Sequence, residues 1–250
     1  MIPERVRQIG EPLLFFLLLG VIWEWSVHAL DIRSYLLPPL SDVFVEMWES
    51  RASLLSHGMV TVVEVIVGFC GAVVLGVIIA GLIFYVPMLR RTLLPFITAL
   101  QSVPKVALAP LMIVWFGYGP MSKYVMAFLF AFFPIVISTL GGLNGTPPNL
   151  VEHFRALRAS AWETTWRLYL PAALPAFLDG CRIAIPLTMI GAIVGEFVGA
   201  QRGLGYVIML TSSSGETDLM FAALITIALL STALFGLFQI GARLVWWRAV

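Results

Sequence analysis

Few side chains of this 250-residue sequence could do chemistry, and those few are scattered. His28, His57 and His153 have no metal-ligand or catalytic motif around them. Cys70 and Cys181 both fall inside apolar stretches, so we interpret them as small buried hydrophobic side chains. An enzyme embedded in a membrane would need paired carboxylates, a metal cluster or a nucleophile beside a base. The sequence therefore predicts no catalytic residue, no metal site and no cofactor.

Ionisable side chains inside the apolar segments are more informative, because a charge in a membrane is costly and marks a functional hypothesis. Glu64 lies about one turn into an apolar segment, so we expect its carboxylate to reach back to the membrane surface. Asp179 and Arg182 are three residues apart and can pair on one helix face. For this pair we favour a structural role over a place in a solute route.

Four side chains form the predicted translocation pathway: Gln101, Lys105, Met189 and Glu196. Lys105 follows Pro104 in an interrupted apolar segment, and backbone groups freed at such a break usually line a cavity or pack against protein. A lysine there could attract an anion. Glu196 lies near the outer end of its segment, where a role in an outer gate and a structural pairing are both open.

The composition explains what must position these residues. The chain is 60% hydrophobic and only 12% charged, whereas a soluble domain has about 25% charged residues. A surface so poor in charge would aggregate in water, so the bilayer is the expected solvent. The net charge of +1 gives no indication of nucleic acid binding. We therefore predict an all-α integral membrane protein in contact with lipid.

The first apolar segment, residues 12–30, could be a membrane span or a cleaved signal peptide. Arg5 and Arg7 precede it, as in a signal peptide. However, Trp23-Glu24-Trp25 stands where the small residues of a cleavage site should be, and a tryptophan pair is typical of a membrane interface. We favour an uncleaved span.

About six spans are predicted in total, since a span needs about 20 mostly apolar residues. A helix lying in the interface is expected over residues 41–56, because apolar residues recur there at helical spacing between charges. We therefore divide the chain into an N-terminal span and interfacial helix (1–56) and a transmembrane domain (57–245). The further spans are expected at residues 59–85, 93–116 (interrupted by Pro104 and Pro110), 123–143, 171–198 and 219–245.

Positive charge orients these spans, because cytoplasmic segments are rich in Lys and Arg. With the N-terminus inside, nine such residues are cytoplasmic and four are outside. An even number of spans returns the C-terminus to the cytoplasm, so both termini and residues 144–169 are predicted to be cytoplasmic. The nine are Arg5, Arg7, Arg90, Arg91, Arg155, Arg158, Arg167, Arg243 and Arg248; the four are Arg33, Arg51, Lys123 and Arg202.

Residues 144–169 are too long and too structured for a simple connection. Asn149 and Glu152 have the spacing of a helix cap, and Ser160 and Glu163 form an S-x-x-E capping box. Two short helices are expected, joined near Ala159, with the second ending before Pro171. From the pattern alone, a docking surface and an ordinary amphipathic surface helix are equally open.

Several segments in order resemble a known family, the permease subunits of bacterial ABC importers. The resemblance covers about residues 35–245 and is closest to the nitrate, taurine, alkanesulfonate and bicarbonate branch. It is carried by Glu152-His153-Phe154-Arg155-Ala156-Leu157-Arg158-Ala159-Ser160, Leu170-Pro171-Ala172-Ala173-Leu174-Pro175, Gly180-Cys181-Arg182, Val103-Pro104-Lys105-Val106-Ala107-Leu108-Ala109-Pro110-Leu111, Trp115-Phe116-Gly117, Leu37-Pro38-Pro39, Gly195-Glu196 and Gly203-Leu204-Gly205.

This resemblance implies a permease half of a type I importer in the bacterial inner membrane. Two copies would pair, two separate ATP-binding subunits would dock on the cytoplasmic helices, and an external solute-binding protein would deliver the solute. The sequence has no G-x-x-x-x-G-K-[ST] phosphate loop, so a partner must handle ATP. The ATPase-coupling residues implied are Glu152, Arg155, Ala156, Leu157, Ala159 and Ser160.

The sequence departs from the family pattern at two places. His153 and Phe154 replace its paired alanines, and Arg158 replaces its glycine. Because Arg does not readily adopt a glycine turn, we expect either a turn one or two residues later, at Ala159-Ser160, or a different ATPase groove.

Gly191, Gly195 and Gly199 recur every four residues and would let another helix approach closely. Packing within the chain is one interpretation. We prefer a dimer interface, because the resemblance places this helix near the centre of a dimer.

Two functions remain in competition. The favoured one is the transport subunit of an ATP-driven importer for a small organic or inorganic anion or a small heterocycle. The alternative is an autonomous secondary transporter or channel, with the broken third span as its site. The segment at 144–169 discriminates between them, because only the importer needs an ATPase dock.

Overall fold

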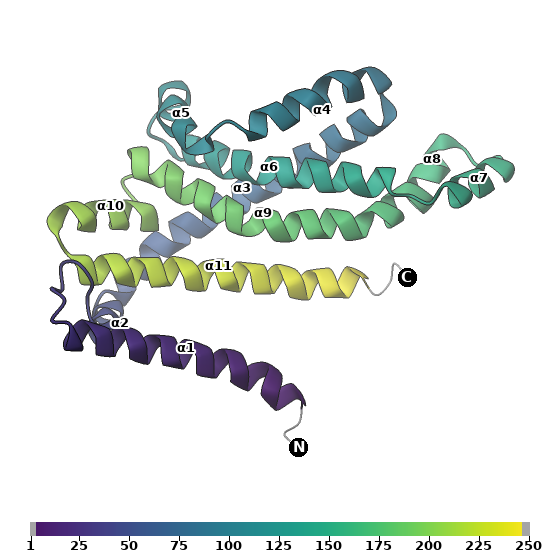
Figure 1. Cartoon of the computed structure of the whole chain (residues 1–250). Helices are drawn as coiled ribbons and strands as arrows, with labels where there is room; N and C mark the ends of the chain where they lie inside the picture. The colour runs from purple at the N-terminus through teal and green to yellow at the C-terminus, as the bar shows by residue number, and fades with distance from the viewer. Residues whose placement is uncertain (1–3, 247–250) are drawn as a thin grey trace.

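The computed structural model describes residues 4–246, and within these residues every regular element is a helix (Figure 1). This confirms the all-α prediction. The α-helices are α1 (Glu4–Ala29), α2 (Leu40–Glu49), α3 (Arg51–Tyr85), α4 (Pro87–Gln101), α5 (Ala109–Phe116), α6 (Pro120–Asn144), α7 (Pro148–Ala156), α8 (Ala161–Thr164), α9 (Leu170–Gly199), α10 (Leu204–Ser214) and α11 (Thr217–Trp246).

Four helices are long and apolar enough to cross a membrane: α3, α6, the continuous helix Ala161–Gly199 and α11. A fifth span can be formed by α4 with α5, which are bent by 93° at a short break. α1 contains a shorter apolar stretch, Leu14–Ala29, and is the sixth element of the predicted set.

Proline determines the shape of the bent pair. Pro104 has a φ of −61° and a ψ of 101°, and it separates α4 from a short 3₁₀ turn, η1 (Lys105–Leu108). The predicted interruption at Pro104 is therefore correct. Pro110 does not interrupt a helix, because it lies in the first turn of α5, where its missing N–H would have no helical partner anyway.

The predicted interfacial helix is shorter than expected. α2 ends at Glu49, and residues from Arg51 onward already belong to α3. Val43 is fully buried in a cluster with Leu54 and Ala222, so α2 packs against α3 and α11.

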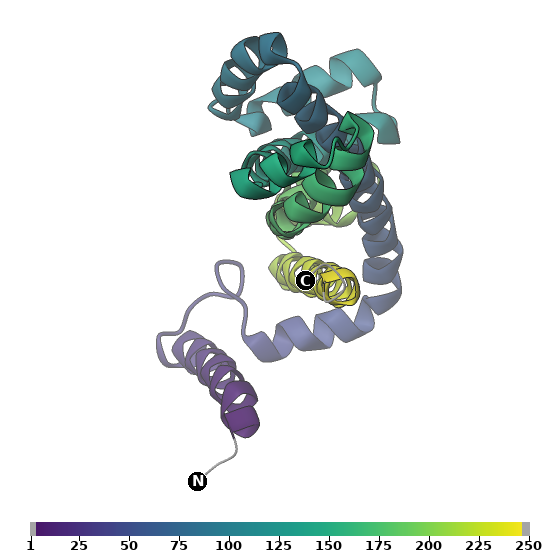
Figure 2. The same cartoon turned by 90° about the vertical axis from the view of Figure 1, so that its right-hand side faces the viewer.

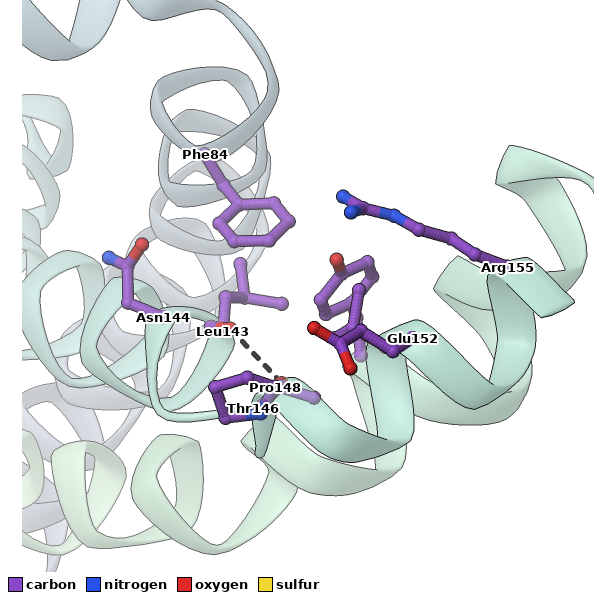
Figure 3. A pocket seen from close by; sticks show the side chains of 9 residues that line it. Phe84, Leu143, Asn144, Thr146, Pro148, Glu152 and Arg155 are labelled. Atoms are coloured by element: carbon purple, nitrogen blue, oxygen red, sulfur yellow. Dashed lines mark hydrogen bonds between the residues drawn. The ribbon is translucent and has the colours of Figure 1, made fainter.

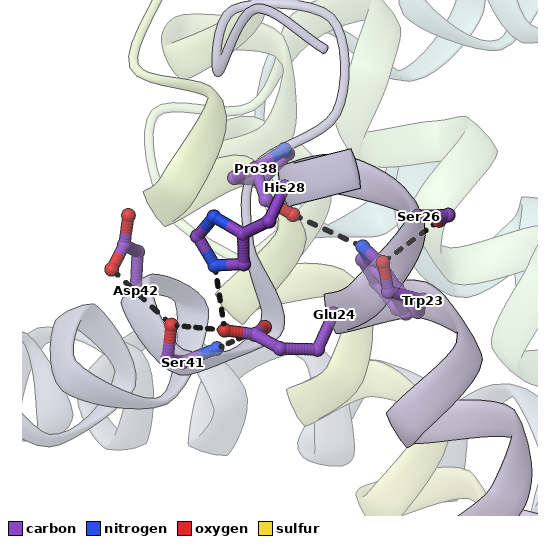
Figure 4. A network of polar contacts seen from close by, with 7 residues as sticks. All are labelled: Trp23, Glu24, Ser26, His28, Pro38, Ser41 and Asp42. Atoms are coloured by element: carbon purple, nitrogen blue, oxygen red, sulfur yellow. Dashed lines mark hydrogen bonds and ion pairs between the residues drawn. The ribbon is translucent and has the colours of Figure 1, made fainter. Parts of the chain in front are cut away.

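α1 stands apart from the other helices and is attached at one end (Figures 1 and 2). The indole N–H of Trp23 donates to the Pro38 carbonyl at 3.0 Å. The Glu24 carboxylate accepts from the backbone N–H of Ser41 at 3.2 Å and from its hydroxyl at 2.9 Å (Figure 4). Because the first backbone N–H groups of a helix lack helical partners, Glu24 caps α2 from the neighbouring helix.

The densest packing joins α6 to α3 and α9, and small residues permit it. A Cβ at Gly68 of α3 would lie 2.5 Å from the Ala127 Cβ of α6. On α9, a Cβ at Gly191 would lie 2.8 Å from the Met126 carbonyl oxygen, and one at Gly195 would lie 3.1 Å from the Lys123 Cα.

The third glycine of the repeat also faces its own chain, since a Cβ at Gly199 would lie 2.5 Å from Ile113 of α5. The structure therefore favours the other interpretation of Gly191, Gly195 and Gly199, packing within the chain, over the preferred dimer interface. α6 and α5 already occupy this face, and the packing is within the chain.

The start of α1 and the end of α11 lie at the same end of the molecule as α7 and α8, whereas α10 lies at the opposite end (Figure 1). This arrangement agrees with an even number of crossings. Which end is cytoplasmic stays a prediction from the charge distribution, and Arg248 of that count lies outside the described residues.

Candidate functional site

The segment between α6 and α9 starts with a tight turn and a proline-initiated helix. The Thr146 hydroxyl donates to the Leu143 carbonyl at 3.1 Å, and the Asn144 amide donates to the Leu140 carbonyl at 2.9 Å. α7 then begins at Pro148, with Pro147 as the preceding residue and no side-chain cap. The predicted cap at Asn149 is therefore wrong, because that residue already lies inside the helix.

α7 ends in a Schellman motif whose left-handed residue is Arg158. Arg158 has a φ of 55°. Its N–H donates to the Arg155 carbonyl at 2.9 Å, and the next N–H, of Ala159, reaches back to the Phe154 carbonyl at 3.1 Å. These two bonds are the pair that defines the motif, which normally has glycine at the left-handed position.

This geometry corrects the prediction that the turn moves to Ala159-Ser160. The turn lies at Arg158 itself, the position where the family pattern has glycine. Ser160 has an extended backbone and begins the next helix. An arginine side chain therefore points outward from a turn that glycine usually makes, at a steric cost of about 1–2 kcal/mol.

The predicted capping box at the next helix is confirmed. The Glu163 N–H donates to the Ser160 hydroxyl at 3.2 Å, and the Ser160 N–H donates to the Glu163 carboxylate at 3.0 Å. Two backbone donors that lack helical partners are thereby satisfied.

The helix that starts here does not end before Pro171, contrary to prediction. α8 continues through a π-helical turn (η2, Thr165–Tyr169) into α9, as one helix of 39 residues. A proline removes one helical hydrogen bond and clashes with the carbonyl four residues earlier. A π turn directly before Pro171 has i→i+5 hydrogen bonds in place of the usual i→i+4 bonds, which gives the proline ring more room. The segment is therefore continuous with a membrane span.

A pocket of about 260 Å³ lies under α7, where α3, α6 and η2 meet (Figure 3). Glu152 and Arg155 point from α7 toward the end of α3. The ring of Phe84 is 4.9 Å from that of Tyr169, which attaches α3 to the π turn. The pocket is lined by Phe84, Leu143, Asn144, Thr146, Pro148, Val151, Glu152, Arg155 and Tyr169.

The structure brings the six predicted coupling residues together on one projecting segment. Five of them have exposed side chains, and Ala159 is partly buried. Trp162 and Trp166 follow on the same segment, 70% and 54% exposed, with their rings 5.3 Å apart. A large exposed aromatic surface beside exposed charge is typical of a contact surface. The five exposed residues are Glu152, Arg155, Ala156, Leu157 and Ser160.

The four predicted pathway residues are not brought together. Met189 is 3% exposed, in a cluster with Val65 and Ala127, and Glu196 is fully buried. Helices of the same chain cover both side chains, so this structure does not expose them to a pathway. Gln101 ends α4 with an exposed side chain, and Lys105 is partly buried at the bend.

Lys105 has aromatic rather than acidic neighbours. Its Nζ lies 4.9 Å from the ring centre of Phe133 and 5.5 Å from that of Phe130. Both distances are within the range of a cation–π interaction. The two aromatic rings thus hold the ammonium group of Lys105 at the bend, and neither of these contacts involves a carboxylate.

Two other predictions about charged residues have opposite outcomes. Arg182 does form an ion pair with Asp179, on a surface of α9 where both side chains are partly exposed. Glu64 does not reach the membrane surface, because it is 4% exposed and contacts Glu196. The Glu64 side chain is buried by contacts with α9 and α10, which are distant from it in the sequence.

An apolar stripe on α9 was missed by the sequence analysis. α9 is among the most buried helices, yet Ile183 and Ile190 are 55% and 49% exposed. Pro186 and Phe197 are exposed on the same side at intervals of three to seven residues. A hydropathy pattern could not reveal this stripe, because lipid-facing, buried and partner-facing positions of a span are all apolar.

Comparison with known proteins agrees with this architecture. Residues 72–246 match the family described as binding-protein-dependent transport system inner membrane component. The chain is similar to a formylaminopyrimidine transport permease protein of Halalkalibacterium halodurans, with 40% identity over 81% of each chain. A riboflavin transport system permease protein of Chloroflexus aurantiacus is 34% identical over 96% of this chain and 91% of its own.

A third relative, a taurine transport system permease protein of Escherichia coli, is 29% identical over 97% of this chain and 91% of its own. Among solved structures, an inward-facing MetNI methionine ABC transporter matches with a TM-score of 0.65 and 23% identity, over 79% of this chain and 96% of that chain. The match over most of the chain, together with the helix order described above, shows that the protein belongs to the binding-protein-dependent transport system inner membrane component family, the permease subunits of ABC importers.

Proposed function

We propose that this permease works as a pair of identical chains and carries a small nitrogen heterocycle, driven by two separate ATP-binding subunits. The observation that carries the proposal is the construction of the segment from α7 to α9. A Schellman turn, a capping box and an uninterrupted helix make it stiff, and its outward surface is charged and aromatic. A stiff projecting segment transmits a partner's movement directly into a membrane span.

The ATP-binding subunit is expected to contact the exposed side chains of α7 and α8. The start of α1 and the end of α11 share this end of the molecule, so we assign it to the cytoplasm together with them. An external binding protein would then deliver solute at the α10 end, as the family description implies.

The second copy is expected against the exposed stripe of α9. Ile183, Pro186 and Ile190 form an exposed apolar surface on a helix that its own chain covers in large part. The pathway would then run between the two copies, with Gln101 and Lys105 of each bent pair beside it.

The solute class follows from two relatives, one named for formylaminopyrimidine and one for riboflavin transport. Both of these solutes contain a nitrogen heterocycle. A sulfonate is the second candidate, because a taurine and an aliphatic sulfonates transport permease are also similar to this chain, at 29% and 34% identity against 40% for the formylaminopyrimidine relative.

The test of coupling is co-purification and uptake. Glu152→Lys reverses an exposed charge of α7, at the pocket between α7 and the end of α3, and should weaken ATPase association and abolish uptake at normal membrane levels. Glu49→Lys, an exposed reversal at the opposite end, should change neither. Equal behaviour of the two variants would contradict the docking assignment.

A cross-linking experiment tests the pairing separately. In a chain with Cys70→Ala and Cys181→Ala, Ile190→Cys should form a disulfide between two copies on mild oxidation. Leu237→Cys, exposed on α11, should not. Equal cross-linking at both positions would reject the α9 stripe as the contact between copies.

A further inference from the structure

A buried cluster of polar side chains joins three helices at the α10 end, and it belongs neither to the proposed ATPase-docking surface nor to the proposed contact between copies. Glu64 of α3 is 4% exposed and Glu196 of α9 is fully buried. Their carboxyl groups lie within hydrogen-bonding reach of each other. Two carboxyl groups can share a hydrogen bond only if one of them carries a proton, because a carboxylate has no hydrogen to donate.

The donors around Glu196 identify which of the two is ionised. The Thr61 hydroxyl donates to one carboxylate oxygen of Glu196 at 2.7 Å, and the Gly205 N–H donates to the other at 2.5 Å. Hydrogen bonds to a carboxylate favour its charged form. Among the residues that the structure describes, no such donor bonds to Glu64, and its buried Oε2 has no hydrogen-bond partner. An unpartnered oxygen is far less costly on a neutral acid than on a carboxylate.

The nearby cation does not neutralise the pair directly. Lys123 of α6 is 3% exposed, and its Nζ donates to the carbonyls of Tyr118, Gly119 and Gly199 at 2.7, 3.0 and 3.0 Å. An ammonium group has three hydrogens, so these bonds use all of them. With one proton on the pair, one carboxylate and one ammonium balance; without it, the buried cluster has an excess negative charge.

The remaining ionisable groups near the pair do not supply a positive charge inside it. His57 accepts a hydrogen bond at Nδ1 from the Gly203 N–H at 3.0 Å. A ring nitrogen that accepts carries no hydrogen itself, so the imidazole is neutral. The titratable and charged groups that surround the pair are His57 on α3, Lys123 on α6, Tyr206 on α10 and Arg202 in the connection before α10.

We propose that Glu64 and Glu196 form a proton-binding site. In this site Glu64 is protonated and its O–H donates a hydrogen bond to the Glu196 carboxylate. Glu196 in turn holds the start of α10, because Gly205 donates to it and Leu204 N–H donates to Thr61 at 2.9 Å. Gly203 has a φ of 114°, and a Cβ there would lie 2.2 Å from the Glu196 carboxyl carbon. The proton therefore allows a hydrogen bond between α3 and α9, at the point where the backbone of Gly203 and Gly205 lies against the Glu196 carboxylate.

Infrared spectroscopy of the purified wild-type chain at neutral pH tests this directly. A C=O stretching band of a buried protonated carboxylic acid should be present and should shift in D₂O. It should be absent from Glu64→Gln, because glutamine reproduces the donor without a carboxyl group. Asp179→Asn, which removes an exposed carboxylate, should leave the band unchanged. A wild-type spectrum without the band, or a band that survives in Glu64→Gln, would overturn the proposal.

Thermal unfolding in detergent gives a second measurement. Loss of the proton leaves two adjacent buried carboxylates, so the melting temperature of the wild type should fall from neutral to alkaline pH more than that of Glu64→Gln. Glu196→Gln should be less stable at every pH, since Gly205 and Thr61 lose a charged acceptor. Parallel curves for wild type and Glu64→Gln would reject the site. If the wild type lacks the infrared band and its melting temperature rises with sodium chloride but not with choline chloride, the site binds a metal cation instead of a proton. That result would also reject the proposal.

Discussion

The hydroxyl groups of Tyr85 and Thr165 lie 2.5 Å apart and connect the end of α3 to the π-helical turn that leads into α9. The two residues are 80 positions apart in the sequence. Their bond links the first long span to the segment proposed to receive the ATP-binding subunit, beside the aromatic contact of Phe84 with Tyr169.

A double-mutant cycle measures this link. Tyr85→Phe and Thr165→Val should each destabilise the chain, and the double variant should cost less than the sum, with a coupling of about 0.5–1 kcal/mol. The measurement is the unfolding free energy or melting temperature in detergent. Strict additivity would show that the two hydroxyls do not stabilise each other.

Arg158→Gly should stabilise the turn after α7. Glycine adopts positive φ without steric cost but loses more conformational entropy on folding, so the variant should gain less than the full steric cost, up to about 1 kcal/mol relative to arginine. Arg158→Ala provides the control, because it removes the charge but keeps the Cβ and should gain nothing from the backbone. Amide exchange of residues 155–160 reports the effect locally; if glycine and alanine behave alike, the left-handed turn is not strained.

Gly191 and Gly141 form a matched pair on the packed helices. Gly191→Ala places a Cβ 2.8 Å from a backbone oxygen of α6 and should cost about 1–3 kcal/mol through overpacking. Gly141→Ala meets nothing within 4 Å and should be neutral or stabilising, because alanine favours a helix. Loss of dimer with an unchanged melting temperature in Gly191→Ala would instead restore the subunit-interface interpretation.

The predicted orientation is tested by cysteine labelling of intact cells in a chain with Cys70→Ala and Cys181→Ala. Glu163→Cys should be inaccessible to a membrane-impermeant reagent from outside and become reactive after lysis. Ser213→Cys, exposed at the α10 end, should react from outside. The reverse pattern would invert the topology and remove the ATPase dock from the cytoplasm.

Local patterns in the sequence were sufficient wherever the interaction itself is local. The capping box of Ser160 with Glu163 and the ion pair of Asp179 with Arg182 each involve residues three apart on one helix, and both were predicted. The break at Pro104 was predicted for the same reason, since a proline restricts its own backbone and that of its neighbour.

The errors concern contacts between distant segments. Glu64 lies inside the chain beside Glu196, and the three glycines of α9 pack against α6 (Gly191 and Gly195) and α5 (Gly199) of their own chain. In a membrane span, residues that face protein and residues that face lipid are equally apolar. Hydropathy therefore could not show which neighbours these side chains would have. The turn at Arg158 was missed because two backbone hydrogen bonds override the preference of arginine for negative φ.

The uninterrupted helix from Ala161 to Gly199 has a mechanical consequence. Its 39 residues extend about 58 Å at about 1.5 Å per residue. Such a rod acts as a lever, in which a tilt of about one degree at the capping box displaces the far end by about 1 Å. Because Glu196 and its bonded partners lie at that far end, an angular change too small to disturb α7 is amplified into a shift comparable to the length tolerance of a hydrogen bond.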